Sequence, residues 1–323
     1  MVVERRTLGR TVLVRTVLTD YDLIVIGAGV AGLTAAMVAG HHGLKVVVVA
    51  PGAAGGQIIN AERIENFPGF PKGVAGHELG TLLFEQAEAA GAEFMLDTVE
   101  GLAVDGEARI VRTATQDIRA PAVVIAAGST QRSLGIPGEA SFLGKGVSYC
   151  ASCDAPLFKG REVCVVGGGD TALDEALVLS SHAARVTIYH RGERLRAQRR
   201  LREQIAAARN VVIEGQTLVE EIAGDAAVTT MRLRAQNTGS SREQKVDGVF
   251  VAVGLDPAAA FLRGAVALDL SGHIETDVMM RTSLAGVFAA GDIRKNSVAQ
   301  IAAVAGDGAT AAIAAFRYLN SRG

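Results

Sequence analysis

Unbroken runs of aliphatic and β-branched residues mark the first predicted strands of this chain. One run covers Tyr21 to Ile26 and another covers Leu44 to Val49, with a helical stretch from Leu33 to Gly40 between them. Continuous apolar runs of this length are typical of parallel strands that are buried on both faces. The turn after the first strand is Gly27-Ala-Gly29-Val-Ala-Gly32. The pattern therefore predicts a βαβ unit with a dinucleotide-binding turn.

The same pattern occurs a second time, about 140 residues later. A strand is predicted from Glu162 to Val166, a helix from Thr171 to Ser181 and a second strand from Arg185 to His190. The turn that opens this helix contains Gly167-Gly-Gly169-Asp-Thr-Ala172. Two such units in one chain indicate an internal duplication of architecture, which is stronger evidence than either glycine motif alone.

Three further apolar segments end in glycine: residues 123–128, 249–254 and 286–291, the last followed by Asp292. Each predicts a buried strand whose final glycine (Gly128 in the first) can bring bare backbone to a cofactor. Segments 92–120 and 211–250 have a shorter, alternating pattern, which favours antiparallel strands. The fold class expected is α/β, with two Rossmann-like dinucleotide-binding domains, the second inserted in the first through two linker strands. The predicted division is an N-terminal extension at 1–20, the first domain at 21–130 and 253–323, and the inserted domain at 131–252.

Composition narrows the classes of protein. The chain has 323 residues, 49% of them hydrophobic, a formal charge of −2 and 38 glycines. A near-neutral chain gives no electrostatic reason to expect a nucleic-acid partner. Its apolar runs are also shorter than the roughly 18 residues that a membrane span needs. Three cysteines, an odd number, together with residues 1–20 that lack a secretory signal pattern, make the cytoplasm the expected location.

Two of the cysteines form the motif Cys150-Ala-Ser-Cys153, which is followed by Asp154. A structural zinc site needs a second pair of ligands that the sequence does not offer, so no metal is expected. A redox disulfide needs only these two thiols. Asp154 is a candidate acid–base group beside a thiolate, or an ordinary helix N-cap, or both. Cys164 lies in an apolar strand and is expected to be a small buried hydrophobe.

The second glycine motif is followed by a basic segment. Arg191, Arg194 and Arg196 come after the strand that ends at His190, where an acidic residue would otherwise bind a ribose hydroxyl. A guanidinium suits a 2′-phosphate because it binds phosphate oxygens bidentately, so these residues favour NADPH over NADH. The alternative is an exposed basic surface, since the charge continues beyond this segment.

Taken together, these motifs resemble the low-molecular-weight thioredoxin reductases, FAD-dependent pyridine nucleotide-disulfide oxidoreductases of class II. The resemblance extends from about residue 20 to the C-terminus. The motifs that carry it are Gly27-Ala-Gly-Val-Ala-Gly32, Gly55-Gly-Gln57, Glu65-Asn66-Phe-Pro-Gly69, Cys150-Ala-Ser-Cys-Asp154, Gly167-Gly-Gly-Asp170 and Gly286-Val-Phe-Ala-Ala-Gly-Asp292.

The resemblance implies that FAD binds the first domain and that a nicotinamide nucleotide binds the second. The implied FAD-binding residues are Gly27, Gly29, Gly32, Gly56, Gln57, Asn66, Gly291, Asp292, Gln300 and Ile301. The implied nucleotide-binding residues are Gly167, Gly169, Asp170, Thr171, Arg191 and Arg196.

The resemblance also implies a mechanism. Electrons would pass from NADPH through FAD to a Cys150–Cys153 disulfide and then to thioredoxin. Cys153 would face the flavin, Cys150 would attack the partner, and Asp154 would donate a proton. The family is a homodimer, and its inserted domain rotates about the two linkers, here near residues 129–133 and 252–256, to present the disulfide and the nicotinamide in turn.

Two departures from the family pattern bear on the electron donor. Gly192 stands where the family has a second arginine, and losing one charge-assisted bond costs about 1.5–3 kcal/mol, or about 10- to 150-fold in affinity. Ala299 precedes Gln300 where the family often has arginine. NADH or a ferredoxin-type donor therefore stays open as an alternative.

Two other functions fit the motifs less well. A small-molecule dithiol oxidase on this scaffold usually has histidine after the CxxC motif, where Asp154 stands, and lacks the second glycine motif. A non-enzymatic flavin-binding sensor would not need an intact CxxC pair.

Overall fold

The chain passes from one folded unit into a second and then returns to the first. The computed structural model describes residues 3–7, 10–14, 16–18, 21–61, 63–262 and 264–322. Unit 1 comprises Met1–Thr130 and Pro257–Gly323, and unit 2 comprises Gln131–Asp256. The predicted N-terminal extension, residues 1–20, lies partly outside the described residues. Its described part contains β1 (Val3–Thr7) and β2 (Arg10–Val14), which pair antiparallel.

The inserted unit ends at Asp256, not at residue 252 as expected from the sequence. The two connecting strands explain the difference. β11 (Ser129–Gln131) pairs with β20 (Leu255–Pro257), and Arg132 Nε donates a 2.9 Å hydrogen bond to Asp256 Oδ1. These contacts hold residues 253–256 to the start of unit 2.

In the described part of unit 1, five parallel strands form the central sheet, in the order β21–β10–β4–β5–β6. They are β4 (Leu23–Ile26), β5 (Val46–Ala50), β6 (Glu93–Leu96), β10 (Ala122–Ile125) and β21 (Val287–Ala289). A second sheet contains β3 (Val17–Leu18), β7 (Val99–Asp105), β8 (Ala108–Thr113) and β9 (Asp117–Ala120). The helices are α1 (Val30–His41), α2 (Gly76–Ala89) and α6 (Ile301–Asn320), with short 3-10 turns η1 (Gly56–Asn60), η3 (Ala260–Leu262) and η4 (Gly291–Ile293).

Alternate residues of each central strand enter different cores. In β4, Leu23 and Val25 pack against α1, α2 and α6, whereas Ile24 and Ile26 pack against the second sheet. Because successive side chains of a strand point to opposite faces, a strand between two layers must be apolar throughout. Unit 1 is therefore a three-layer arrangement, which explains the unbroken apolar runs in the sequence.

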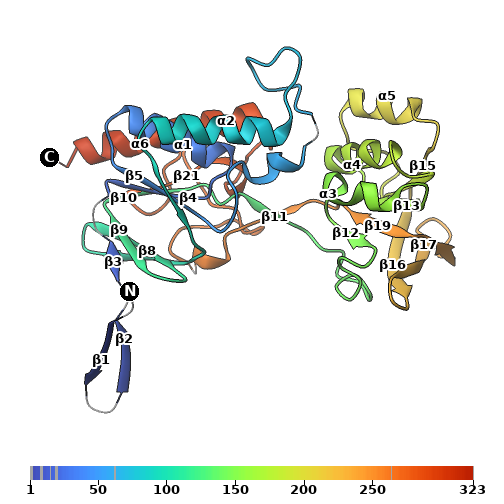
Figure 1. The fold of residues 1–323 in the computed structure, drawn as a ribbon, viewed down its shortest axis with the longest axis horizontal. Coiled ribbons are helices and arrows are strands. Elements are labelled where there is room, and N and C mark those ends of the chain that lie inside the picture. Colours follow the sequence, from blue (N-terminus) through green and yellow to red (C-terminus); the bar gives the residue numbers. More distant parts are fainter. Residues whose placement is uncertain are drawn as a thin grey trace. The chain divides into compact units, whose positions relative to one another are not determined.

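Unit 2, all of whose residues are described, repeats this plan. Its parallel sheet has the order β12–β19–β13–β14–β15, and helices cover one face while an antiparallel sheet covers the other (Figure 1). The parallel strands are β12 (Val147–Ser148), β13 (Glu162–Val166), β14 (Arg185–Tyr189), β15 (Val211–Glu214) and β19 (Gly248–Val251). The antiparallel strands are β16 (Thr217–Gly224), β17 (Val228–Ala235) and β18 (Ser241–Lys245). The helices are α3 (Ala151–Asp154), α4 (Asp170–Ser180) and α5 (Arg199–Ala207), with η2 (Ala155–Phe158).

The parallel α/β architecture predicted from the sequence is confirmed. The prediction of antiparallel strands throughout 92–120 and 211–250 was wrong at two places. β6 and β15 are the edge strands of the two parallel sheets. The side chains of β6 and β15 are exposed or only partly buried, which produces the broken apolar pattern that usually indicates an antiparallel strand, whereas β12 and β21 at the opposite edges are fully buried. Among the helices that the structure describes, none has the length and hydropathy needed to cross a membrane.

Candidate redox and nucleotide-binding sites

The two cysteines of the CxxC motif lie at the start of α3 and are joined by a disulfide. Cys150 is the N-cap of this short helix, and its Sγ accepts a 3.2 Å hydrogen bond from the Cys153 backbone N–H. Ser148 Oγ in turn accepts the Cys150 N–H at 3.0 Å. Cys150 is partly buried and Cys153 is exposed. The Cys150 sulfur is thus held at the helix N-terminus by the backbone of its own motif.

Asp154 is the last residue of α3 and lies at the N-cap position of η2, but its side chain makes no capping hydrogen bond there. Capping of η2 by this carboxylate, one of the two roles considered from the sequence, is therefore not observed. The carboxyl group is partly buried beside Cys153. Its place next to the disulfide is compatible with the acid–base role.

A glutamate that the sequence analysis missed also contacts this helix. Glu175, on α4, accepts the N–H of Ala151 through Oε2 at 3.1 Å. Burial raises the pKa of Glu175 to about 7, the Ala151 N–H lowers it, and the nearby carboxylates of Asp174 and Asp154 raise it further. No motif connects Glu175 with the cysteines. Only its position one helical turn from Ala172 of the glycine motif could have drawn attention to it.

A second buried carboxylate orders the chain just before Cys150. Glu139, 4% exposed, accepts the backbone N–H groups of Leu134 and Gly135, both at 2.8 Å, and the hydroxyl of Tyr149 at 2.7 Å. Burial and this carboxylate raise the pKa of Tyr149 to about 12, so the phenol stays protonated and keeps donating. Glu139 therefore connects residues 134–135 to Tyr149, which directly precedes Cys150.

The second glycine motif forms the turn between β13 and α4. At Gly167, φ is +153° and a Cβ would collide with the Ala252 carbonyl, so this glycine is needed for the turn itself. At Gly169, which precedes α4, a Cβ would meet nothing within 4 Å. Open space at a helix N-terminus suits a phosphate group.

The basic segment is tied to this turn. The Arg196 N–H donates to the Gly168 carbonyl at 2.7 Å, and the Gln198 N–H donates to Asp170 Oδ1, also at 2.7 Å. Arg191, Arg196 and Thr171 are exposed beside it. The carboxylate of Asp170 thus holds the basic segment against the glycine turn, a role that the sequence did not reveal.

His190, the last residue before this segment, is only 7% exposed, and burial lowers its pKa. Its ring contacts the positions where Gly168 and Gly215 would carry a Cβ. A neutral, buried imidazole therefore packs behind the turn.

In unit 1, the first glycine motif and η1 together form a cradle of bare backbone. Gly27 (φ +105°) and Gly32 are required for packing, since a Cβ would collide with the Ala126 carbonyl and the Gly27 carbonyl respectively. Gly29 is different, because a Cβ there would have Gly56 Cα as its nearest neighbour, at 4.0 Å. The Gly55 N–H donates to the Ala28 carbonyl at 2.7 Å and brings Gly56 alongside.

The remaining predicted residues of the first site come from distant parts of the chain. Gln57 Nε2 donates to the Ser129 carbonyl at 2.9 Å, next to Gly128, and Asn66 Nδ2 donates to Gln300 Oε1 at 3.2 Å, at the start of α6 where Ile301 follows. Asp292 Oδ1 accepts the Ser297 hydroxyl at 2.7 Å, and the Gly291 N–H donates to Asp307 Oδ2 at 3.2 Å. These hydrogen bonds pair predicted residues of unit 1 with one another or with Ser129, Ser297 and Asp307, which the sequence did not indicate.

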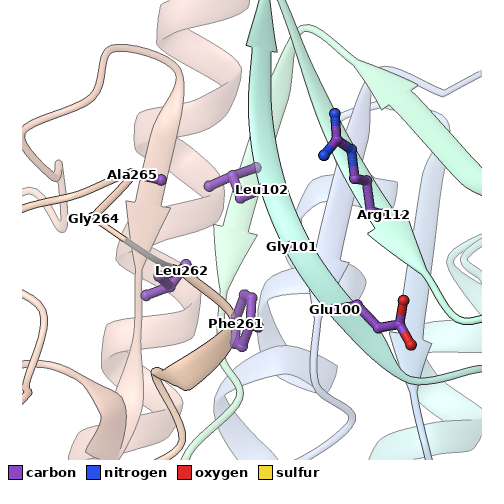
Figure 2. Close-up of a pocket in the computed structure, with 8 residues that line it drawn as sticks. All are labelled: Glu100, Gly101, Leu102, Arg112, Phe261, Leu262, Gly264 and Ala265. Carbon is purple, nitrogen blue, oxygen red and sulfur yellow. The ribbon is translucent and has the colours of Figure 1, made fainter.

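Unit 1 also has a surface hollow that belongs to none of these sites. It has a volume of about 410 Å³ and lies between β7, β8 and η3. Figure 2 shows the residues that line it, among them Leu102 and Phe261 and the charged Glu100 and Arg112. It contains neither a cysteine nor a glycine-rich turn.

Known proteins show the same arrangement. Residues 21–308 match the model of the family described as pyridine nucleotide-disulphide oxidoreductase. The chain is 40% identical over 303 residues to a thioredoxin reductase of Treponema pallidum, covering 94% of this chain and 98% of that protein. It is 39% identical over 300 residues to a thioredoxin reductase of Bacillus subtilis, covering 93% and 95%. The crystal structure of Lactococcus lactis thioredoxin reductase superposes with a TM-score of 0.91 at 36% identity, covering 94% of this chain and all of that one. The chain therefore belongs to the pyridine nucleotide-disulphide oxidoreductase family.

Proposed function

We propose that this protein is a thioredoxin-disulfide reductase that carries electrons from NADPH through FAD and the Cys150–Cys153 disulfide to thioredoxin. The observation that carries the proposal is the disulfide itself. It lies at the start of α3, it is followed by a carboxyl group, and unit 2 also has open space beside Gly169 at the N-terminus of α4. The similarity to thioredoxin reductases over more than nine-tenths of the chain supports it.

The residues of unit 1 fit a dinucleotide. The space beside Gly29, which a Cβ would fill, suits a pyrophosphate, and the amides of Gln57 and Asn66 supply polar groups nearby. FAD bound there would supply a two-electron carrier between a hydride donor and a disulfide. Glycine turns of this kind bind the pyrophosphate through backbone N–H groups at the helix N-terminus.

The chemistry at unit 2 is a thiol–disulfide exchange. Reduction breaks the Cys150–Cys153 bond with two electrons and two protons, and the Cys150 thiolate then attacks the disulfide of thioredoxin. This attack frees one thioredoxin sulfur, which takes up a proton. Cys153 then loses its proton and attacks Cys150 Sγ, which re-forms the Cys150–Cys153 disulfide and frees the second thioredoxin sulfur to take up the second proton. Asp154, partly buried next to Cys153, is the group we assign to hold that proton.

NADPH is the donor we propose, because the backbone of Arg196 is bonded to the glycine turn and the side chains of Arg191 and Arg196 are exposed there. One observation favours NADH as a second candidate. At Gly192 there is no side chain where a second guanidinium would strengthen binding of a 2′-phosphate. We further propose a homodimer that acts in the cytoplasm, as in the family that the sequence resembles.

The first test is an anaerobic titration of the purified flavoprotein with NADPH and then NADH, following the loss of flavin absorbance. Reduction at low micromolar NADPH supports the proposal. Reduction mainly by NADH shifts it to the second candidate, and failure with both nucleotides while dithionite works contradicts a nicotinamide donor.

A second test addresses the disulfide. Cys153→Ser should retain flavin and lose thioredoxin reduction. Cys164→Ala is the matched control, because Cys164 is buried and contacts Met231, and its thiol pKa is raised by burial. Thioredoxin turnover by Cys153→Ser at the wild-type rate would overturn the assignment.

A further inference from the structure

The backbone next to Cys150 is held by a side chain that plays no part in the mechanism above. Glu175 reaches from α4 to the first residue of α3 and accepts the N–H of Ala151 at 3.1 Å. Ala151 is fully buried, so this N–H is shielded from water and depends on the carboxyl group for its hydrogen bond. The contact lies one peptide bond from the sulfur-bearing residue.

Glu175 lies within a small group of acidic side chains. Asp174 precedes it on α4, and Asp154 follows Cys153 on α3; both make Glu175 harder to ionise. The other elements packed against α4 are α5, β13, β14 and η2. Their charged residues are Arg199, Arg200, Arg202 and Glu203 on α5, Glu162 on β13 and Arg185 on β14. Burial and like charges leave Glu175 with a pKa of about 7, so its charge changes around neutral pH.

We propose that Glu175 is a positioning residue of the redox disulfide, which holds the backbone beside Cys150 and couples its own proton to the ionisation of the Cys150 thiol. The inference rests on the proposed function, since it requires the disulfide to be reduced during turnover. Reduction adds two electrons and two protons to the disulfide and leaves two thiols; release of one proton to solvent then leaves the Cys150 thiolate. An ionised Glu175 repels that thiolate and a protonated one does not. Two groups that interact in this way titrate as a coupled pair.

The test is the pH dependence of alkylation at Cys150. The full-length flavoprotein is reduced with dithiothreitol, desalted anaerobically and treated with iodoacetamide from pH 5 to 9, and the modified peptide is quantified by mass spectrometry. Wild type should show two steps. Glu175→Gln should show one step at lower pH, with about three- to tenfold faster alkylation above pH 7, where Glu175 of the wild type is ionised, since a shift of half to one pKa unit changes the thiolate fraction by that factor; below pH 6 the two proteins should react alike.

Two variants separate coupling from a merely structural effect. Glu175→Asp keeps an ionisable group and should retain two steps, whereas Glu243→Gln, which removes an exposed carboxylate on β18 of the same unit, should follow wild type. If Glu175→Gln does not fold, Glu175→Asp tests the proposal instead. Its shorter side chain moves the carboxyl group, so the two steps of the alkylation profile should be separated by a different pH interval than in wild type.

Profiles of the Glu175 variants that superimpose on wild type would overturn the inference. The alkylation assay uses neither nicotinamide nucleotide nor thioredoxin. Failure of NADPH or NADH to produce the dithiol would therefore count against the proposed function alone, and the titration would still be measured.

Discussion

A single methyl group at Gly29 should separate flavin binding from folding. The φ of Gly29 is −80° and its Cβ would have no neighbour closer than 4.0 Å, so alanine fits the polypeptide. The methyl would occupy the space assigned to the pyrophosphate. We expect Gly29→Ala to fold normally and to bind FAD at least tenfold more weakly, because one lost charge-assisted hydrogen bond costs about 1.5–3 kcal/mol. Fluorescence titration of the deflavinated protein with FAD measures this.

Gly101→Ala is the control for that experiment. Gly101 lies in β7, and its Cβ would meet the Arg112 side chain at 3.9 Å, an ordinary contact outside the predicted site. Equal FAD affinity in the two variants would mean that the space beside Gly29 is not where the pyrophosphate binds.

Gly192 offers a test of nucleotide choice at one residue. Its φ is not in the left-handed region, and a Cβ would have Arg194 O as its nearest neighbour, at 3.4 Å. Gly192→Arg should therefore fit and should improve the ratio of NADPH to NADH in kcat/KM by about 10- to 150-fold, through one added charge-assisted bond to phosphate. Steady-state kinetics with both nucleotides checks this. Gly192→Gln, which adds length without charge, should leave the ratio close to wild type.

At the scale of the elements, one largely buried ion pair joins the residue that follows η4 to helix α6. Arg294 Nε lies 2.6 Å from Asp307 Oδ2, with side chains 17% and 10% exposed, and the same carboxylate accepts the Gly291 N–H. Asp307→Ala removes the partner of a largely buried guanidinium, which typically destabilises a fold by about 3–5 kcal/mol. Urea unfolding followed by circular dichroism should show this loss, together with earlier release of flavin.

The exposed pair Arg119–Asp105 is the comparison for this ion pair. Its side chains are 41% and 57% exposed, and such pairs contribute about 1 kcal/mol or less. If Asp105→Ala destabilised the protein as much as Asp307→Ala, burial would not be the reason for the strength of the Arg294–Asp307 pair.

The sequence predicted those elements whose pattern is determined locally. β13 is found at the predicted residues, and α1 and α4 follow their glycine motifs as expected, because a two-sided buried strand and a helix-opening turn each leave a distinct sequence pattern. β6 and β15 were predicted as antiparallel strands but pair parallel with β5 and β14. The sequence of such a strand does not indicate which strand it will pair with.

At the candidate sites, too, the sequence predicted local motifs but not the contacts between distant residues. Glycine and cysteine motifs are contiguous in the chain, so they were found, whereas the pairing of Gln57 with Ser129 or of Glu175 with Ala151 is created only by folding. Asp170 was assigned to nucleotide binding, yet its carboxylate bonds to Gln198, a partner that no spacing rule indicates.

At the scale of the molecule, the two units are built on the same plan and each has its own cores. Both parallel sheets place the strand before the glycine turn at the centre, and helices and an antiparallel sheet cover their two faces. None of these four cores mixes residues of the two units. A unit with its own core can fold by itself.

Unit 2 is also continuous in sequence, and its ends are close together. The Arg132 N–H donates to the Gly254 carbonyl at 2.9 Å, and Arg132 forms an ion pair with Asp256. We therefore expect residues 131–256, expressed alone, to fold cooperatively, to form the Cys150–Cys153 disulfide and to bind NADPH without binding flavin. Calorimetry should give one transition whose midpoint rises with NADPH, since a ligand that binds only the folded state stabilises it. The same transition should appear in the intact protein and should not move when FAD is removed, while a second transition falls. A fragment that remains unfolded, or a single transition in the intact protein that moves with either ligand, would show that the two units depend on each other for stability.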